Sequence, residues 1–206
     1  MKNVLIFGII AFLFACGPKQ KMSLFKKGKT LAVAGFSQPR HSWEMLAGYI
    51  YETKEIPPEI FQKLNVFLLE TFKQKQITFV GPKGVRQCEE LIIGKEHRSD
   101  MSAFNYWLEV GKCIPADFIV VPFVFKWQER EGGEWGVESP AAVVMDFYLL
   151  DVNNKQVQRF HFEEEQLSLS ENIFDIDKFF KRRGRWVTAS ELAKEGIKEF
   201  CEELGL

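Results

Sequence analysis

Two short apolar segments separated by an amphipathic one place the strongest constraint on the fold of this chain. Thr30–Phe36 (TLAVAGF) and Ile77–Gly81 (ITFVG) are rich in β-forming residues and end in turn residues, which is typical of buried strands. Between them, Pro57 and Pro58 precede Glu59–Gln74, whose apolar residues recur at the three-and-four spacing of a helix packed on one face. Because such a strand–helix–strand unit closes as a right-handed crossover, we expect the two strands to be parallel.

The middle of the chain predicts two helices followed by an antiparallel meander. The helices are expected over Val85–Ile93 and Met101–Lys112, and the strands over Asp117–Trp127, Ala142–Val152 and Gln156–Glu164. Residues 129–140 read as a long hairpin connection, and Asn153-Asn154 predicts a two-residue turn. Proline has no N–H to donate, so Pro122 places its strand at a sheet edge or at a bulge there.

A final helix is expected to begin at Thr188. Thr188 and Glu191 form a capping box, and Val187 is placed to pack against Leu192. The apolar stripe of this helix is Leu192, Ala193, Ile197, Phe200 and Leu204. The chain, 46% hydrophobic and without a linker-like tract, therefore predicts one α/β (α+β) domain. Its mixed sheet has a parallel βαβ start and an antiparallel three-strand meander, with helices packed on the sheet.

The amino terminus predicts export and lipidation. One lysine precedes an apolar run, Val4–Ala15, that is shorter than the ~20 residues of a spanning helix, so residues 1–15 read as a signal peptide. The sequence Leu13-Phe14-Ala15-Cys16 resembles the lipobox of bacterial lipoproteins, which implies lipidation of Cys16 and cleavage just before it. Residues 16–29 are then a lysine-rich tether, and residues 30–206 are the globular domain.

The same resemblance implies a location. In Gram-negative lipoproteins, a residue other than Asp after the lipidated cysteine implies delivery to the outer membrane, and Gly17 stands there. We therefore expect the protein in the cell envelope, held by acyl chains at the periplasmic face of the outer membrane. The lysines of the tether either contact an anionic bilayer surface or only keep the tether soluble.

Three cysteines follow Cys16: Cys88, Cys113 and Cys201. An odd number in an exported protein leaves at least one thiol unpaired. Their apolar or helical contexts favour buried free thiols, and a Cys88–Cys113 disulfide is the alternative. No histidine stands at metal-ligand spacing with any of them, so we expect neither a metal nor a cofactor.

The sequence contains no catalytic signature, since GxSxG, HExxH, Walker and GxGxxG motifs are all absent. The formal net charge is −1 at pH 7, so no overall field attracts a polyanion. Asp146 is the one carboxylate inside an apolar strand; it is either a perturbed group or, by alternation, faces water or caps a turn. We expect a protein that is not an enzyme and binds no nucleic acid.

Two segments are candidate binding surfaces. The loop Ser37–Ile56 follows a strand's carboxyl end and carries residue types that anchor protein interfaces; its aromatic residues otherwise only cover the core. With the hairpin residue Trp135, the candidate partner-binding residues are Arg40, His41, Trp43, Tyr49, Tyr51 and Trp135. The second segment follows a short expected helix, Ser170–Phe180, and is either a patch for lipid phosphates or an acidic partner, or a solvated connector. Its residues are Lys181, Arg182, Arg183 and Arg185.

The order of TLAVAGF, ITFVGP, GVRQCEEL and ADFIVVPFVFKW in an exported lipoprotein resembles the envelope lipoproteins with a TolB-amino-domain-like fold, the LpoB and CsgG-type group. The likeness covers Thr30–Leu150. It implies a membrane-tethered, non-enzymatic adaptor that binds another envelope protein or itself. The chain lacks the long tether of the synthase activators and the extra strands of the secretion pores, so neither activity is implied. A carrier or sensor of a lipid or small ligand is the alternative function.

Overall fold

The computed structural model describes residues 25, 28–47, 54–94, 100–132, 137–166 and 187–205, and its main sheet has the strand order β2-β1-β3-β6-β7. The strands of this sheet are β1 (Leu31–Val33), β2 (Phe79–Val80), β3 (Phe118–Gln128), β6 (Ala142–Asp151) and β7 (Gln156–Glu165). The short strands β4 (Glu131–Gly132) and β5 (Val137–Ser139) form a separate hairpin. The helices are α1 (Pro58–Gln74), α2 (Pro82–Ile93), α3 (Ala103–Cys113) and α5 (Ala189–Glu203).

The sheet combines a parallel half with an antiparallel half, as the sequence predicts. Strand β1 pairs in parallel with β2 on one side and with β3 on the other. Strand β6 then pairs antiparallel with both β3 and β7. The expected crossover and meander are therefore confirmed, and together they make one α/β domain.

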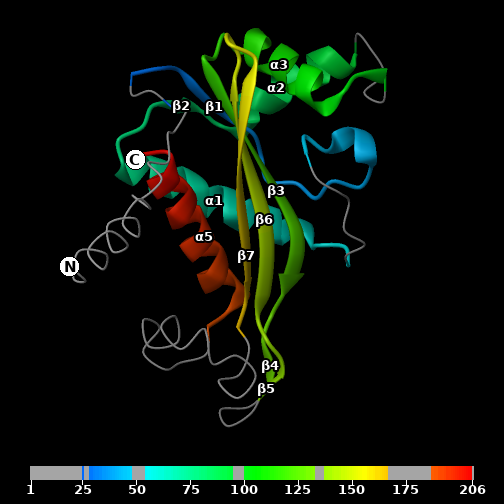
Figure 1. Cartoon of the computed structure of the whole chain (residues 1–206), viewed down its shortest axis with the longest axis vertical. Coiled ribbons are helices and arrows are strands. Elements are labelled where there is room, and N and C mark those ends of the chain that lie inside the picture. Colours follow the sequence, from blue (N-terminus) through cyan, green and yellow to red (C-terminus); the bar gives the residue numbers. More distant parts are fainter. Residues whose placement is uncertain are drawn as a thin grey trace, which may run out of the picture.

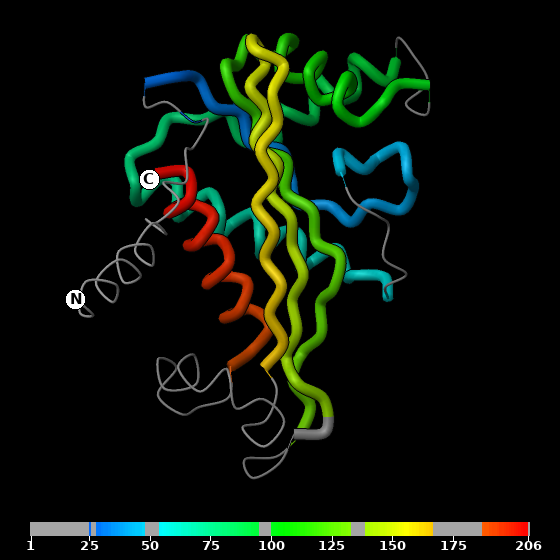
Figure 2. Tube along the Cα trace, viewed as in Figure 1, coloured from blue at the N-terminus to red at the C-terminus, as the bar shows by residue number. Residues whose placement is uncertain are grey.

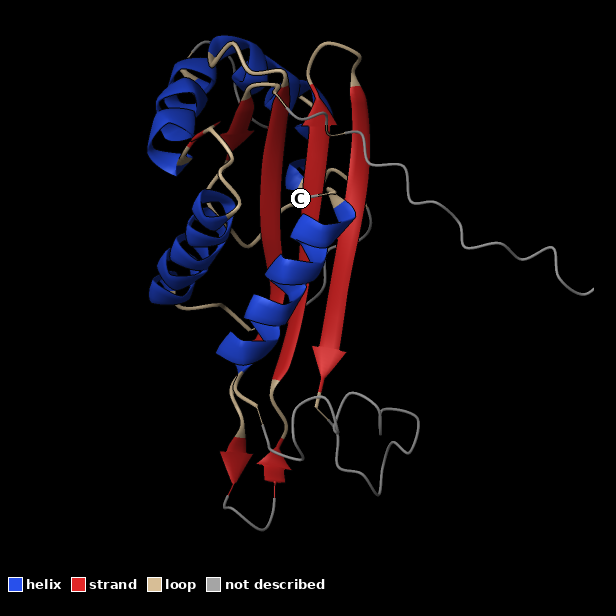
Figure 3. Cartoon of the chain, turned by 90° about the vertical axis from the view of Figure 1, so that its left-hand side faces the viewer, coloured by secondary structure: helices blue, strands red, loops and turns tan. Residues whose placement is uncertain are grey.

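Helices cover both faces of the sheet. Helices α1 and α5 pack on one face, and Figure 3 shows α5 lying across the long strands. Helices α2 and α3 pack together on the other face, at one end of the sheet (Figure 1). We call these the α1/α5 face and the α2/α3 face. Every residue of β6 is buried, because side chains from both of its faces enter a core. Within the described ranges, no helix combines the length and apolar composition needed to cross a bilayer.

The placement of β3 differs from the expectation. β3 is an inner strand between β1 and β6, and Pro122 pairs regularly with Phe147. The carbonyls of Val120 and Pro122 accept hydrogen bonds from the N–H groups of Ala34 and Ser37, so this part of the Pro122 backbone faces β1. β1 ends at Val33, so no residue of β1 lies opposite Pro122. The hydrogen bond that proline cannot donate is therefore not required for the pairing of β3 with β1.

A bulge does occur in β3, but further along than Pro122. The register against β6 shifts between Val124 and Lys126, which leaves Phe125 as the extra residue. Phe125 packs in the core of the α2/α3 face, whereas Trp127 packs against the core of the α1/α5 face. Strict alternation would put both rings on one face, so the bulge is what returns Trp127 to the other core.

The turn between β6 and β7 is also longer than expected. Asp151 pairs with Gln156, so residues 152–155 make a four-residue turn instead of the two-residue Asn153-Asn154 turn. Asp151 Oδ1 accepts the N–H groups of Asn153 (3.1 Å) and Asn154 (2.8 Å). These bonds satisfy the backbone of a wider turn, and Lys155 closes it with a positive φ of 54°.

Asp117 holds together three segments at one end of the sheet. Its carboxylate accepts the N–H of Thr30 (2.9 Å), the ammonium of Lys29 (3.3 Å) and the side-chain amide of Asn153 (3.1 Å). The Thr30 N–H bond, aided by Lys29 and Asn153, holds the pKa of Asp117 below its usual value, although desolvation opposes it. The start of β1 is thereby fixed to the start of β3 and to the β6–β7 turn.

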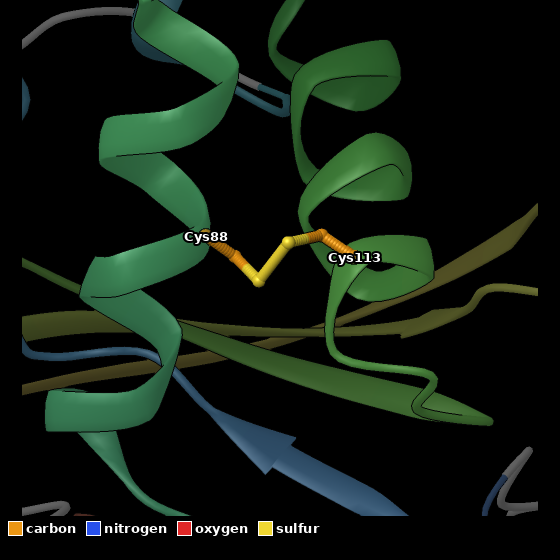
Figure 4. The surroundings of a disulfide bond; sticks show 2 residues. All are labelled: Cys88 and Cys113. Atoms are coloured by element: carbon orange, nitrogen blue, oxygen red, sulfur yellow. A yellow bond between two sulfur atoms is a disulfide. The ribbon is translucent and has the colours of Figure 1, made fainter.

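Two of the three cysteines after Cys16 are not the buried free thiols that the sequence analysis favours. Cys88 and Cys113 form a disulfide that joins α2 to α3, with their Cα atoms 5.8 Å apart (Figure 4). These two helices lie side by side on the sheet, which brings the thiols of distant residues within bonding distance. Cys201 is the free, buried thiol, as expected, and burial raises its pKa to about 12, so it stays protonated.

Helix α5 forms as its local sequence predicts. Thr188 Oγ1 accepts the N–H of Glu191 (3.2 Å), and Glu191 Oε2 accepts the N–H of Thr188 (2.9 Å), which completes the capping box. All five stripe residues are buried, as is Val187. A Cβ on Gly196 would lie 2.6 Å from the Phe162 ring, so this glycine permits the close approach of α5 to β7.

Candidate functional site

The loop that follows β1 crosses the α2/α3 face of the sheet. Its described part, residues 37–47, is called here the β1 loop, and Figure 2 shows it beside the sheet below α2 and α3. Its start is held because Val124 donates its N–H to the Ser37 carbonyl (2.9 Å). A single turn of 3-10 helix, Ser42–Glu44, is closed by Glu44 Oε2, which accepts the N–H groups of Arg40 (2.5 Å) and His41 (2.9 Å).

A pocket of about 340 Å³ lies where the β1 loop meets α2, α3 and β3. We call it the aromatic pocket, because four of its lining side chains are aromatic and they come from three different elements. Its lining residues are Ser37, Gln38, Pro39, Trp43, Glu44, Glu89, Ile93, Tyr106, Trp107 and Phe123. The carboxylates come from the β1 loop and from α2. Among the lining residues that the structure describes, there is neither lysine nor arginine.

The aromatic wall of this pocket is fixed by core packing. Tyr106, Trp107 and Phe123 are buried in the core of the α2/α3 face, while Trp43 is half-buried in the loop above them. The rings of Tyr106 and Trp107 meet edge to face with centroids 5.1 Å apart. The indole Nε1 of Trp107 is buried and has no hydrogen-bond partner in the described part of the chain. A buried donor in this state costs about 1–3 kcal/mol unless an acceptor from outside reaches it.

A buried carboxylate supports the pocket from the neighbouring strands. Asp146 is completely inaccessible to solvent, so the expectation that it faces water is wrong. Arg159 donates to both of its oxygens, from Nε (2.9 Å) and Nη2 (3.0 Å). His161 Nδ1 lies 2.7 Å from Oδ1, and the Tyr148 hydroxyl lies 2.9 Å from Oδ2. Four contacts use the full acceptor capacity of a carboxylate, and this makes its burial tolerable.

Tyr148 connects this carboxylate to the β1 loop and to the aromatic pocket. Its hydroxyl lies 3.0 Å from the carbonyl of Ala47, the last described residue of the loop. Its ring packs edge to face on Phe123, which lines the pocket. Burial, and then the adjacent Asp146 carboxylate, raise the pKa of Tyr148 well above its usual value, so the hydroxyl keeps its proton. The single proton is shared between two acceptors and holds the loop end against the sheet.

A second, larger pocket of about 610 Å³ lies near the start of the described chain, and we call it the basal pocket. It is bordered by the segment before β1, the segment from α1 into β2, and the carboxyl end of α5. Its lining residues are Phe25, Gly28, Lys29, Thr30, Lys75, Gln76, Ile77, Thr78, Phe79, Val80, Leu204 and Gly205. The lining combines apolar side chains with two threonines, one glutamine and two lysines, so its composition differs from that of the aromatic pocket.

Of the candidate site residues predicted from the sequence, three lie in the described part of the chain, and one of these lines the aromatic pocket. Trp43 lines the aromatic pocket, and the exposed His41 ring stacks on Trp43 with centroids 5.1 Å apart. Arg40 is exposed and pairs with Glu55, and it does not line the pocket. The other candidates lie outside the described residues: Cys16, Tyr49, Tyr51, Trp135, Lys181, Arg182, Arg183 and Arg185.

Sequence reasoning missed most of the pocket. For Tyr106, Trp107 and Phe123 the sequence predicts only that they lie in a helix and in a strand, and it makes no prediction for Glu89. One available signal was the Tyr106-Trp107 pair, because adjacent helical residues lie about 100° apart and such large rings extend beyond a narrow buried stripe. Among the described residues, no cluster of three His, Cys, Asp or Glu side chains is placed to hold a metal ion.

Among known proteins, this chain is similar to several solved structures. No protein-family model matches the chain, and the curated proteins give no match. The PelC dodecamer from Paraburkholderia phytofirmans is 14% identical, with a TM-score of 0.48, over 89% of this chain and 93% of that chain. The LpoB C-terminal domain from Salmonella enterica is 9% identical, with a TM-score of 0.43, over 71% and 89%. A lipoprotein from Neisseria meningitidis is 7% identical, with a TM-score of 0.37, over 76% and 98%.

The LpoB-type group named from the sequence is thus among the structures to which this chain is similar. Likeness at this level of identity and TM-score assigns no role to any residue. The aromatic pocket is therefore defined by the geometry of this chain alone.

Replacing Asp146 with Asn tests the buried network. The amide nitrogen of Asn would face donors from Arg159, His161 and Tyr148, so we expect the free energy of unfolding to fall by about 3 kcal/mol. Urea denaturation measures this change. The matched control is Glu163→Gln, because Glu163 is exposed and also contacts His161, and we expect it to change stability by less than about 0.5 kcal/mol. Equal stability of Asp146→Asn and wild type would show that the network does not stabilise the fold.

Proposed function

We propose that this chain is a lipid-anchored protein of the bacterial cell envelope and that its domain is a protein-binding adaptor. The aromatic pocket is the proposed contact surface. The observation that carries the proposal is the pocket itself, because four aromatic side chains from the β1 loop, α3 and β3 converge on it. Tryptophan and tyrosine in well-packed pockets supply most of the binding energy in many protein interfaces.

The short chain length between the expected lipid anchor and the domain supports this function. The expected lipidated residue, Cys16, precedes Phe25 by nine residues, and an extended chain of that length reaches at most about 30 Å. Phe25 lies against the domain, where its ring packs edge to face on Phe118. The domain is therefore held close to the bilayer in this proposal, and its partner is another protein of the same envelope.

An exposed apolar residue at the aromatic pocket extends the proposed surface. Ile93 lines the pocket with about half of its surface exposed. Large exposed side chains beside a pocket are typical of the rim of a protein interface. Val66 on α1 is equally exposed but lies on the helix that covers the opposite face of the sheet.

A photocrosslinking amino acid at position 93 tests the adaptor function in living cells. We expect one discrete adduct with an envelope protein, identified by mass spectrometry, and no such adduct from position 66. Trp43→Ala in the same background should weaken binding by about thirtyfold, as expected for an interface anchor, and remove the adduct. An adduct that persists in the Trp43→Ala variant, or that forms equally from position 66, would contradict a contact through this pocket.

Replacing Cys16 with Ala tests the anchor. Without a cysteine to lipidate, we expect the protein to move from the membrane fraction to the soluble fraction of lysed cells, because the acyl chains supply the membrane affinity. Cys201→Ala is the matched control, since that thiol is buried in the core and its change should leave fractionation as it is. If the Cys16→Ala protein stays with the membrane, lipidation is not what holds it there.

A carrier or sensor of a lipid or other small ligand is the second candidate function. The basal pocket favours it, since about 610 Å³ lies within the range of roughly 300–1,000 Å³ for small-molecule sites. Native mass spectrometry of the purified chain measures this directly. A carrier should retain a ligand of defined mass that Thr78→Trp, a pocket-filling change, displaces. A purified chain with no bound ligand would count against this function.

A further inference from the structure

Strand β7 forms one outer edge of the five-stranded sheet. Within the described residues it pairs with β6 alone, and Figure 3 shows it at the margin of the domain, with no described helix or strand beyond it. Its ten residues keep a regular register against β6 and include neither proline nor glycine. Natural proteins blunt exposed edges with short strands, bulges or proline, and β7 has none of these features. It is therefore a long and regular template for a further strand.

The hydrogen bonds of the sheet show which backbone groups of β7 point outward. In an antiparallel pair, every second residue directs both its N–H and its C=O to the neighbouring strand. Gln166 donates its N–H to the Ala141 carbonyl (2.9 Å), so the even-numbered residues of β7 face β6. The backbone groups of the odd-numbered residues face away from β6, and all five of these residues are exposed. They are Val157, Arg159, His161, Glu163 and Glu165.

The basic and acidic residues of this edge are separated along the strand. Arg159 and His161 precede Glu163 and Glu165. In a parallel pairing in register, a second β7 would place like charges opposite one another, which is unfavourable. In an antiparallel pairing centred on Phe162, Arg159 lies opposite the second copy's Glu165, and His161 lies opposite the second copy's Glu163. The edge is therefore complementary to itself in one orientation.

The charges and the backbone of this edge have different roles in such a pairing. The Asp146 carboxylate offsets part of the Arg159 charge within each chain, so the charge pairs between copies mainly select the orientation. Affinity comes from main-chain hydrogen bonds, as in other proteins that add a strand to a sheet edge. Four pairs of outward-facing residues, two from each charge pairing, would make about eight such bonds across the axis.

We propose that β7 is the edge through which two copies of this chain form a symmetric dimer. The two β7 strands pair antiparallel about a two-fold axis near Phe162, and the two sheets join into one. Because the axis is perpendicular to the sheet, the α1/α5 faces of both copies lie on the same side, and the same residues contribute from each copy. The inference goes beyond the proposed adaptor function, since no described lining residue of the aromatic pocket belongs to β7.

Amide hydrogen exchange of the full purified chain, followed residue by residue by NMR, tests the pairing. Samples from about 10 µM to about 1 mM span the range in which such a dimer forms. With rising concentration, protection of the amides of Arg159, His161, Glu163 and Glu165 should increase by at least about tenfold. The amides that face β6 should stay protected at every concentration. Sedimentation equilibrium of the same samples gives the dissociation constant of the dimer.

Two variants weaken the pairing through different groups. Glu163→Pro removes an outward-facing N–H that β6 does not use, so it should weaken dimerisation by about tenfold or more and leave the pairing of β6 with β7 intact. The double change Glu163→Lys with Glu165→Lys places basic residues opposite basic residues and should also weaken dimerisation by about tenfold or more. Glu59→Lys with Glu70→Lys on α1 is the matched control, because both residues are exposed and the change in charge is the same.

A chain that stays monomeric at the highest concentration, a dimer whose outward-facing β7 amides remain unprotected, or equal effects of the edge variants and the α1 control would each overturn the proposal. Protection that appears only after another envelope protein is added would show that β7 pairs with a strand of that protein, which also contradicts pairing between copies. Trp43→Ala should leave the dissociation constant of the dimer unchanged. Failure of the adaptor contact and failure of the dimer can therefore be told apart.

Discussion

The complete burial of β6 is the constraint on which the rest of the structure depends. A strand whose ten residues are all buried needs a hydrogen-bonded neighbour on each side and a covering layer on each face. Strands β3 and β7 supply the neighbours, and α1 with α5 covers one face. On the other face α2 and α3 cover only one end of the sheet, so the β1 loop must cover part of the remainder (Figure 2). The aromatic pocket lies where these two covers meet.

Asp146 makes this arrangement specific. A carboxylate at a fully buried position is strongly unfavourable unless donors surround it. Tyr148 donates from β6 itself, whereas Arg159 and His161 contact Asp146 only when β6 and β7 pair in the observed register. A shift of β7 by one residue would turn Phe160 and Phe162 away from α5 and remove both β7 partners from Asp146. The same carboxylate positions Tyr148, which contacts both the β1 loop and Phe123. A single charge therefore links strand register to the geometry of the pocket.

The pocket itself is assembled from segments far apart in the chain. Trp43 and Glu44 come from the β1 loop, Glu89 from α2, and Trp107 from α3, and the Cys88–Cys113 disulfide fixes the two helices to each other. Because the disulfide closes a loop within one wall of the pocket, it restricts the motion of that wall as well as the unfolded chain. A rigid aromatic wall below a loop residue such as Trp43 is a preorganised surface, and preorganisation lowers the entropic cost of binding.

The sequence by itself determined what depends on neighbours within a few turns or strand residues. It predicted the order of the elements, the parallel start, the meander and the Thr188–Glu191 capping box, because periodicity, caps and short crossovers are local. It did not place Pro122 in an inner strand, widen the turn at 152–155 or bury Asp146, and it gave the Cys88–Cys113 disulfide only as the alternative to free thiols. Each of these follows from which strands become neighbours and which helices share a face. Only the tertiary structure decided them, and with them the aromatic pocket, because distances between residues far apart in sequence are set by packing and not by local pattern.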